Sequence, residues 1–569
     1  MTFAPAFAPT ALTLSLAVTL TLAGCAARAP APAAPIDINL VALNDFHGHL
    51  EASKFIYTSV RDGKENTMLA GGIDNLAAAL QAYRAEDKDL LLVGAGDLVG
   101  GTPAMSSMWG DEPSIVALSM LGMKFSSVGN HEFDQGRAEL LRKQRGGCTP
   151  ALGVKSCKLA PDFRGAAFTY LGANVIDKVT GQPLLPAFAI EQVKGVKVAF
   201  IGAVLKNTPS VVLASGIAGL AFTDEADAIN TALLQARAQG ATAFVVLIHE
   251  GGETPEPFDQ PDCAQLKGPI VSIAEKLDPA VRLIISGHTH RGFQCKVGDR
   301  TITQAQMGGH VLSRIKLSID PANGSVRDVA VRNVLVKPGE YPADPKLADY
   351  LAQVKAQSAA ALARPIARVA QRSTVRKLND AGESALGGLV ADAVAEATRA
   401  QGVQVGFMNM GGLRSDFDVA DNLTATFGQA QAVLPFSNTL VVMDMTGAQL
   451  RALLENQWMR AAGGRSMLQV SRSFYYKWDN AKPDGQRVVP GSMRIDGVPV
   501  DEAKTYRIVA NNFLAEGGDG YPVFKQGANK IDTQIVDLDA FVGYLSSNQP
   551  GSAAMVAPAA PAPRIERVN

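Results

Sequence analysis

The stretch from Val128 to Asp134, Val-Gly-Asn-His-Glu-Phe-Asp, places metal-binding and proton-handling side chains side by side. Asn130 and His131 follow a glycine, and Asp134 is close enough along the chain to orient the imidazole of His131. A histidine held by a carboxylate can give or take a proton at a reacting group. The stretch therefore predicts a turn in a catalytic site.

Four further segments carry the same kinds of side chain, and the chain has only seven histidines. Each segment follows an apolar run of strand length, as the Val128–Asp134 turn does. The segments are Asn44–Gly48, Gly94–Asp97, Ile248–Glu250 and Ser286–His290. Because an α/β sheet gathers the ends of its strands at one edge, we expect all five to form one site.

The side chains of this site predict a particular metal chemistry. Asp, Asn and His without cysteine suit Zn, Mn, Co or Fe better than copper or an iron-sulfur cluster. A carboxylate that bridges, here Asp97, allows two ions to lie close together, which is the arrangement used to hydrolyse phosphate esters. The sequence therefore predicts two divalent metal ions that acidify water and neutralise charge on a phosphoryl group.

Length and composition indicate a globular protein of more than one domain. The chain has 569 residues, of which 47% are hydrophobic and 19% charged. With 53 basic and 54 acidic residues there is no excess charge to attract a nucleic-acid polymer or anionic lipid. We therefore expect no nucleic-acid polymer as a partner.

Strand and helix patterns alternate through residues 36–338, which predicts an α/β domain that contains all five segments. The expected elements include strands at 36–44, 197–203 and 242–248 and helices at 113–121 and 224–238. A linker region, 339–363, contains a predicted helix at 344–363 that ends before Pro365. A second α/β domain follows at 364–547 and has no histidine, so it cannot share the metal chemistry.

The first residues are typical of an export signal rather than of a folded element. Ala11–Ala23 is too short to cross a bilayer, and Leu22-Ala23-Gly24-Cys25 resembles a bacterial lipobox with Cys25 as the lipidated residue. An ordinary signal peptide is the alternative. We expect residues 1–25 to be a lipoprotein signal, 26–35 an Ala/Pro tether, and 548–569 a disordered tail. The protein would then be exported and held by a lipid anchor at the cell envelope, in the outer membrane facing the periplasm.

Export changes the interpretation of the remaining four cysteines. In an oxidising compartment an even number favours disulfides over thiolate ligands, and no Cys-x-x-Cys spacing supports a zinc site. Four cysteines allow three pairings. Cys148 and Cys157 close a short loop, and Cys263 and Cys295 flank the segment that ends at His290, so we expect these two pairs.

The motifs Asp-x-His, Gly-Asp, Gly-Asn-His-Glu, His and Gly-His-x-His together resemble those of the calcineurin-like metallophosphoesterases. With the second domain, the chain is similar over nearly its whole mature length to bacterial periplasmic 5'-nucleotidases, UDP-sugar hydrolases and animal ecto-5'-nucleotidase. The resemblance implies an N-terminal four-layer α/β/β/α sandwich joined by a linker helix to a C-terminal α/β nucleotide-recognition domain.

The resemblance also implies a role for each residue of the predicted site. One ion would be held by Asp45, His47 and His290, and the other by Asn130, His249 and His288, with Asp97 bridging. His131, oriented by Asp134, would stabilise the transition state or assist the leaving oxygen, with Asn130 beside it.

In the second domain, the loops with glycine and aromatic residues predict contact with a planar base. The resemblance implies that the substrate is a nucleotide. Phosphate or ribose would be bound by arginines and Asn409, the base would lie between two phenylalanines, and an acidic residue would lie near the ribose. The residues concerned are Arg372, Arg376, Asn409, Arg414, Phe436, Phe513 and Asp519. Two of the three arginines could instead be solvated surface charges.

These observations favour an exported two-metal phosphohydrolase that releases phosphate from nucleoside 5'-monophosphates. The same architecture supports UDP-sugar hydrolysis, a 2',3'-cyclic-nucleotide phosphodiesterase with 3'-nucleotidase activity, and a manganese thiohydrolase of sulfur oxidation. A lipoprotein that captures nucleotide or metal without catalysis is an alternative of another class. His131 and Asp134 argue against it, because neither is needed merely to hold ions.

Overall fold

The computed structural model describes residues 1–4, 6, 33–149, 156–459, 467–547 and 563–569. Cys25, nearly all of the expected signal and tether, and residues 548–562 of the expected tail lie outside these ranges. In the part of the chain that the structure describes, every helix is too short or too polar to cross a membrane.

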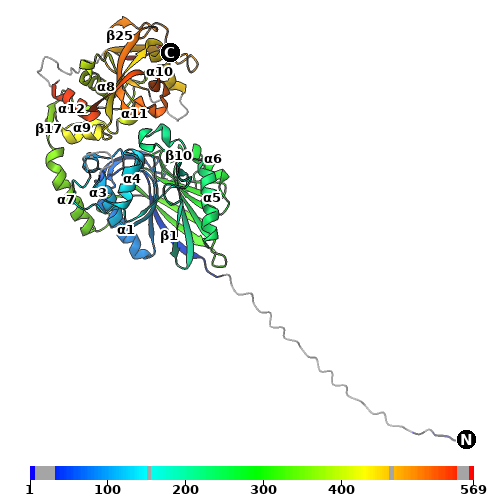
Figure 1. Cartoon of the computed structure of the whole chain (residues 1–569). Coiled ribbons are helices and arrows are strands. Elements are labelled where there is room, and N and C mark those ends of the chain that lie inside the picture. The colour runs from blue at the N-terminus through cyan, green and yellow to red at the C-terminus, as the bar shows by residue number, and fades with distance from the viewer. Residues whose placement is uncertain (5, 7–32, 150–155, 460–466, 548–562) are drawn as a thin grey trace. The chain divides into compact units, whose positions relative to one another are not determined.

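Two six-stranded sheets form the centre of the N-terminal region (Figure 1). The first has the order β16 (Val326–Leu335), β15 (Val311–Ile319), β1 (Ile36–Leu43), β4 (Leu91–Ala95), β5 (Met123–Ser127) and β6 (Thr169–Leu171). The second has the order β13 (Gly292–Val297), β14 (Arg300–Ala305), β12 (Val281–Ile285), β11 (Ala243–His249), β9 (Val196–Val204) and β8 (Phe188–Val193).

The two sheets pack face to face, and helices cover their outer faces. Val93 and Leu40 of the first sheet share one buried cluster with Val245 and Phe200 of the second. Figure 1 shows α1 (Ile73–Glu86) and α3 (Glu112–Met120) on one side of the sheets and α5 (Glu225–Ala238) and α6 (Pro269–Lys276) on the other. This is the four-layer α/β/β/α sandwich expected from the sequence.

The strands that carry the site are buried on both faces, which explains their continuous apolar runs. All seven residues of β11 and all five of β4 are buried. The expected helices also begin where capping residues allow: the side chain of Asp224 accepts hydrogen bonds from the first turn of α5. Observed and predicted bounds of the expected helices and strands differ by at most one residue.

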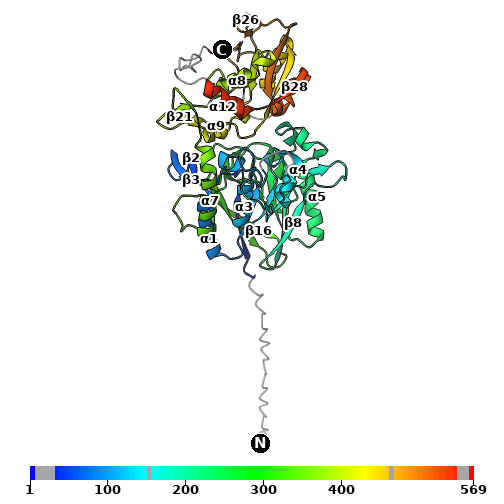
Figure 2. The same cartoon turned by 60° about the vertical axis from the view of Figure 1, so that its left-hand side comes forward.

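The predicted linker helix is α7 (Pro345–Leu362), which begins with Asp344 as its cap and a proline in the first turn. Leu347, Leu351 and Val354 bury one face of α7 in the cluster that lies under α1 and α3. Figure 2 shows α7 alongside α1. Smaller elements of this region are α2 (Ala104–Ser107), α4 (Gly136–Arg145), the hairpin β2 (Ser53–Thr58) and β3 (Glu65–Ala70), and the pair β7 (Val175–Asp177) and β10 (Leu220–Phe222).

The C-terminal region is built on a five-stranded sheet with helices on both faces. Its order is β23 (Gln469–Val470), β19 (Val405–Met408), β27 (Thr505–Asn511), β22 (Thr439–Thr446) and β28 (Ala528–Val536). The helices are α8 (Ala385–Ala397), α9 (Phe427–Val433), α10 (Gly447–Met459), α11 (Asn512–Ala515) and α12 (Asp537–Ser547). Short strand pairs are β17 (Pro365–Arg368) with β21 (Thr424–Thr426) and β18 (Ser373–Thr374) with β20 (Phe417–Asp418).

The expected disorder of the whole tail from residue 548 is wrong at its end. β29 (Ile565–Arg567) pairs in parallel with β24 (Phe474–Trp478), in a four-stranded sheet that also holds β25 (Arg494–Ile495) and β26 (Val498–Pro499). Arg564 fixes this strand, because its guanidinium donates to the buried carboxylate of Asp392 at 2.9 Å. The buried ion pair and the strand pairing stabilise this end of the chain, although the segment before it is rich in Ala and Pro.

Candidate metal and substrate site

The five polar segments follow the carboxyl ends of five strands. Strands β1, β4 and β5 are parallel neighbours in the first sheet, and β11 and β12 are parallel neighbours in the second. Parallel strands bring their carboxyl ends to the same edge, and face-to-face packing brings the two edges together. The structure thereby gathers the candidate ligands into two overlapping groups: Asp45, His47, Asp97 and His290 in one, and Asp97, His249 and His288 in the other.

The first group converges on the carboxylates of Asp45 and Asp97. His290 Nε2 lies 3.3 Å from Asp45 Oδ1 and 3.1 Å from His47 Nε2. His47 Nε2 lies 3.7 Å from Asp97 Oδ2. The ligand atoms of this group all lie within 4.8 Å of one another, a separation that one ion could span.

The second group shares Asp97 with the first. His249 Nε2 lies 2.9 Å from Asp97 Oδ2, and His288 Nδ1 lies 3.1 Å from Asn130 Oδ1. Asn130 is thus placed with the histidines of this group, as the resemblance implies. Asp97 is the one residue common to both groups, which is the placement expected of a bridging carboxylate.

Hydrogen bonds to the protein backbone orient the histidine rings. His47 Nδ1 donates to the carbonyl oxygen of Gly100 at 2.7 Å, and His249 Nδ1 donates to that of Ala95 at 2.8 Å. A carbonyl can only accept, so each Nε2 presents its lone pair to the centre of the site. Backbone partners of this kind fix the tautomer that a metal ion requires.

The inward Nε2 atoms of His47 and His249 lie close to the carboxylate of Asp97. His249 Nε2 is buried and makes no hydrogen bond, although the Asp97 carboxylate is 2.9 Å away. Burial opposes protonation of His249, but Asp97 and Asp45 outweigh burial and raise its pKa to about 10. Burial lowers the pKa of His47 well below its usual value. Lone pairs and carboxylates this close need positive charge between them, so the residues present fit divalent cations.

The backbone at the candidate ligands is strained. Five of them adopt positive φ, a region that side chains other than glycine rarely enter: Asp45 (49°), His47 (45°), Asp97 (50°), His288 (74°) and His290 (54°). Strain of this kind costs roughly 1–3 kcal/mol per residue and persists where the surrounding structure holds it for function. Its concentration in one cluster supports a functional site.

His131 lies beside the Asp97 carboxylate, and Asp134 orients its ring. Its backbone N–H donates to Asp97 Oδ1 at 2.9 Å, and its Nδ1 lies 2.8 Å from Asp134 Oδ2. Burial opposes protonation of His131, but Asp134 and Asp97 raise its pKa above the usual value. With Nδ1 turned to Asp134, Nε2 is the atom that can exchange a proton with a substrate.

Two of the predicted substrate residues lie next to this histidine. The Phe436 ring stacks on the His131 ring at a centroid distance of 5.7 Å and an interplanar angle of 13°. The Arg414 guanidinium lies 5.7 Å from the Phe436 centroid and also approaches Gly101, where an added Cβ would be 3.1 Å from Arg414 Nε. Arg414 and Phe436 therefore border the metal site.

The three predicted arginines are placed differently. Arg376 Nη1 donates to the carbonyl oxygen of Arg414 at 3.2 Å, so these two cations are neighbours. Burial and then Arg376 lower the pKa of Arg414. Two adjacent cations bordering the site favour an anion there. Arg372 is instead 68% exposed at its side chain and pairs with Asp421, and the role predicted for it stays a prediction.

The remaining substrate residues form a separate contact group. Asn409 Nδ2 donates to Asp519 Oδ2 at 2.7 Å, and Asp519 has a positive φ of 53°. The Phe513 ring packs so closely on Gly518 that a Cβ added to this glycine would clash with the ring. The structure thus brings Asn409, Phe513 and Asp519 into one loop cluster, and their contacts with a nucleoside stay a prediction.

No sequence motif assigns a role to Asn44, Asp111 or Glu132, although each supports the site. Asn44 donates to Asp45 Oδ2 at 2.6 Å. Asp111 accepts from Gly100 N and from the hydroxyl of Thr102. Glu132 accepts four backbone N–H groups, and burial followed by Asp97 raises its pKa to about 7. The one available signal was position: Asn44 and Glu132 each adjoin a candidate ligand or catalytic residue in sequence.

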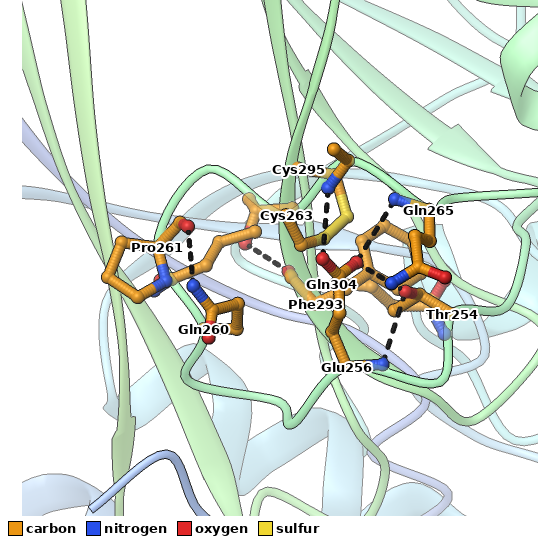
Figure 3. Close-up of a disulfide and its surroundings, with 12 residues drawn as sticks. Thr254, Glu256, Gln260, Pro261, Cys263, Gln265, Phe293, Cys295 and Gln304 are labelled. Carbon is orange, nitrogen blue, oxygen red and sulfur yellow. Dashed lines mark hydrogen bonds between the residues drawn. A yellow bond between two sulfur atoms is a disulfide. The ribbon is translucent and has the colours of Figure 1, made fainter.

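Both expected disulfides are present, Cys148 with Cys157 and Cys263 with Cys295. Figure 3 shows the second, which ties the loop after β11 to β13.

The carboxylate of Glu256 lies near this disulfide and accepts from the backbone N–H of Ala264 and Gln265. Glu256, Cys263 and Cys295 lie close enough to hold an ion, but sulfurs joined to each other are not thiolate ligands.

A buried aspartate, Asp537, contacts the loop that carries Phe436. Asp537 is 1% exposed at the start of α12, and its backbone N–H donates to the carbonyl oxygen of Asn438 at 2.8 Å. Burial raises the pKa of Asp537 to about 7, against an unfolded value of about 3.9. The folded protein therefore binds more protons between these values, and this group lowers stability as pH rises through them.

Asp537→Asn should raise the melting temperature more at pH 8 than at pH 4.5. The amide is neutral at both pH values, whereas the wild type must keep a buried carboxyl protonated or bury its charge. Thermal unfolding of both proteins at the two pH values measures the difference. Asp539→Asn, at an exposed position of the same helix, is the control and should show no such pH dependence. Equal shifts at both pH values would contradict the raised pKa.

Two protein families match the chain. Calcineurin-like phosphoesterases match residues 38–292, and the 5'-nucleotidase C-terminal domain matches residues 360–526. The cell wall protein Lmo0130 of Listeria monocytogenes is 30% identical over 539 residues, which cover 91% of this chain and 68% of that protein. The endonuclease YhcR of Bacillus subtilis is also 30% identical over 515 residues, but the chain spans only 40% of its length.

A solved structure agrees with the family matches. The 5'-nucleotidase precursor from Thermus thermophilus superimposes with a TM-score of 0.72 at 28% identity. The match covers 94% of this chain and 100% of that one. The likeness therefore extends over both regions and the helix between them.

Proposed function

Because the chain belongs to the calcineurin-like phosphoesterases that carry a 5'-nucleotidase C-terminal domain, we propose that it releases phosphate from nucleoside 5'-monophosphates. The observation that carries this proposal is the stacking of Phe436 on His131, with Arg414 alongside. An aromatic surface and a cation beside a metal site suit a substrate with both a planar base and a phosphate. The name of the Thermus thermophilus relative supports the same activity.

The candidate ligands would hold two divalent cations from the group Zn, Mn, Co and Fe. These ions would neutralise charge on the phosphoryl oxygens and acidify water at neutral pH. The protein's own groups then position the substrate: Arg414 and Arg376 hold the phosphate, and His131 faces the ester oxygen. Asp134 keeps the His131 ring in place, so a proton on Nε2 can pass to the leaving oxygen.

The nucleoside would be bound by the loops of the C-terminal region. Phe436 and Phe513 would stack on the base, and Asn409 and Asp519 would contact the ribose. Within this proposal UDP-sugars are a further class of substrate, and 2',3'-cyclic-nucleotide phosphodiesterase with 3'-nucleotidase activity is the alternative activity. The His131–Asp134 pair favours an enzyme over a lipoprotein that only captures nucleotide or metal.

Phe436→Ala and Phe513→Ala test the nucleotide proposal. Loss of one stacking surface costs about 1–3 kcal/mol, so KM for AMP should rise roughly 5- to 150-fold. KM for a small aryl phosphate should change much less, because that substrate lacks the base. Initial rates of phosphate release measure both constants.

The control for this test is Phe427→Ala. Phe427 is a partly buried residue of α9, and the Arg364 guanidinium lies over its ring. This substitution should change KM for the two substrates equally. Equal losses on both substrates in Phe436→Ala and Phe513→Ala would instead assign these rings to packing and remove the support for a base-binding site.

We also propose that the protein is exported and anchored by lipid at Cys25, so that it meets the membrane only through the anchor. The apolar run before Cys25 and the two disulfides support export. Metabolic labelling with radioactive palmitate tests the anchor: wild type should be labelled and Cys25→Ser should not. Labelling of Cys25→Ser to the wild-type level would contradict it.

A further inference from the structure

Glu132 is a buried carboxylate that lies between two of the loops carrying candidate ligands. It is 1% exposed in the short helix His131–Phe133. Its Oε2 accepts from Asp97 N at 2.9 Å and from Gly129 N at 2.5 Å. Its Oε1 accepts from Leu98 N at 2.9 Å and Val99 N at 3.4 Å. The Tyr170 hydroxyl also donates to Oε1, at 3.3 Å.

These bonds join the segments where the strand ladders have ended. Strands β4 and β5 stop pairing at Ala95 and Ser127. Asp97 and Gly129 lie beyond those ends, and Gly129 immediately precedes Asn130. Gly129 is also packed so closely on Asp97 that an added Cβ would clash with its carboxylate and backbone nitrogen. The carboxylate of Glu132 therefore holds the two loops together where no strand pairing does.

We propose that Glu132 is a positioning residue that fixes the separation between the bridging ligand Asp97 and the Asn130 loop, and thereby sets metal affinity. The proposal rests on the proposed two-metal function but concerns binding of the ions rather than hydrolysis. Glu132 need not contact metal or substrate. It acts through the backbone of the residues that do, which also fixes the strained φ of Asp97.

Glu132→Gln removes this support with little change in shape. The new amide group donates where the carboxylate oxygen accepted, so it faces two backbone N–H groups that lose their acceptor. The loops must then shift apart or leave buried donors unpaired. Residues that orient metal ligands typically change metal affinity by roughly 10- to 100-fold when replaced, and we expect a loss in this range.

Glu455→Gln is a matched control. Glu455 is also a buried glutamate, and its oxygens accept from Val488 N at 2.7 Å and from Arg487 N at 2.9 Å. It lies in α10, in the region without histidines, and supports no candidate ligand. Both variants should lower the melting temperature, but only Glu132→Gln should weaken metal binding.

The experiment is calorimetric titration of Mn²⁺ into the chelator-stripped full-length chain. We expect Glu132→Gln to bind Mn²⁺ at least about 10-fold more weakly than wild type, and Glu455→Gln to stay within about 3-fold. Glu132→Asp, which keeps the charge but is too short to reach both loops, should also bind more weakly and serves where Glu132→Gln does not fold. Wild-type affinity and stoichiometry in Glu132→Gln would overturn the proposal. If Glu132→Gln does not fold, the same result in Glu132→Asp would overturn it.

The titration separates this inference from the proposed activity. If wild type binds Mn²⁺ but hydrolyses no nucleotide, the proposed substrate is wrong and the Glu132 result still stands. If wild type binds no divalent metal under these conditions, the metal assignment fails and the role of Glu132 fails with it.

Discussion

Asp97→Ala is expected to lower phosphate release by at least about 10³-fold. Asp97 belongs to both candidate ligand groups and also accepts the backbone N–H of His131. Its removal therefore weakens both ion positions and leaves His131 less well held. Several kilocalories per mole of transition-state stabilisation come from such ions, which corresponds to a loss of this size.

The metal content of Asp97→Ala should fall along with its activity, and elemental analysis of the purified protein measures it. Asp97→Asn keeps the shape and removes the charge, so it should show the same two losses in milder form. Full activity of Asp97→Ala after exhaustive chelation would contradict the assignment of two metal ions to the site.

His131→Ala should lower kcat by roughly 10²- to 10⁴-fold, the usual range for a positioned acid or base, with near-normal metal content. His131 touches the metal site through its backbone N–H, which alanine retains, whereas its ring is directed by Asp134. Steady-state kinetics and elemental analysis on the same preparation separate the two effects.

His310→Ala is the control for the histidine experiment. The His310 ring is buried and makes a 2.7 Å hydrogen bond with the hydroxyl of Ser53, so it has a structural partner outside the ligand groups. It should keep kcat even if stability falls. If His131→Ala loses bound metal as well as kcat, His131 is a metal ligand and its proposed role is wrong.

The parts of the site that sequence predicted are those set by residue type and strand position. Asp45, Asp97 and His249 follow or end buried apolar strands, so the strand and helix periodicities place each of them at the carboxyl end of a strand. Asp45 and Asp97 adjoin strands of the first sheet, whereas His249 ends a strand of the second, and the packing of the two sheets brings them together. The ligand groups therefore follow from local pattern together with a general rule of α/β folds.

The support around the site could not be predicted in the same way. Glu132 and Asp111 act by accepting backbone N–H groups. Every residue except proline can supply such a group, so no sequence pattern identifies the partner. Which arginine reaches the site also depends on tertiary packing, since Arg376 meets Arg414 whereas Arg372 pairs with Asp421. Strand β29 was missed because its partner β24 is remote in sequence.

The measurement that tests the central claim most directly is phosphate release by the purified chain after removal of metal and reloading with Mn, Co or Zn. The substrates are AMP, 3'-AMP, 2',3'-cyclic AMP and a UDP-sugar, each at the same concentration. We predict no release from the stripped protein, recovery with at least one of these metals, and the highest kcat/KM on AMP. Hydrolysis of AMP that persists unchanged without metal, or no hydrolysis of any of these nucleotides by the reloaded protein, would contradict the account.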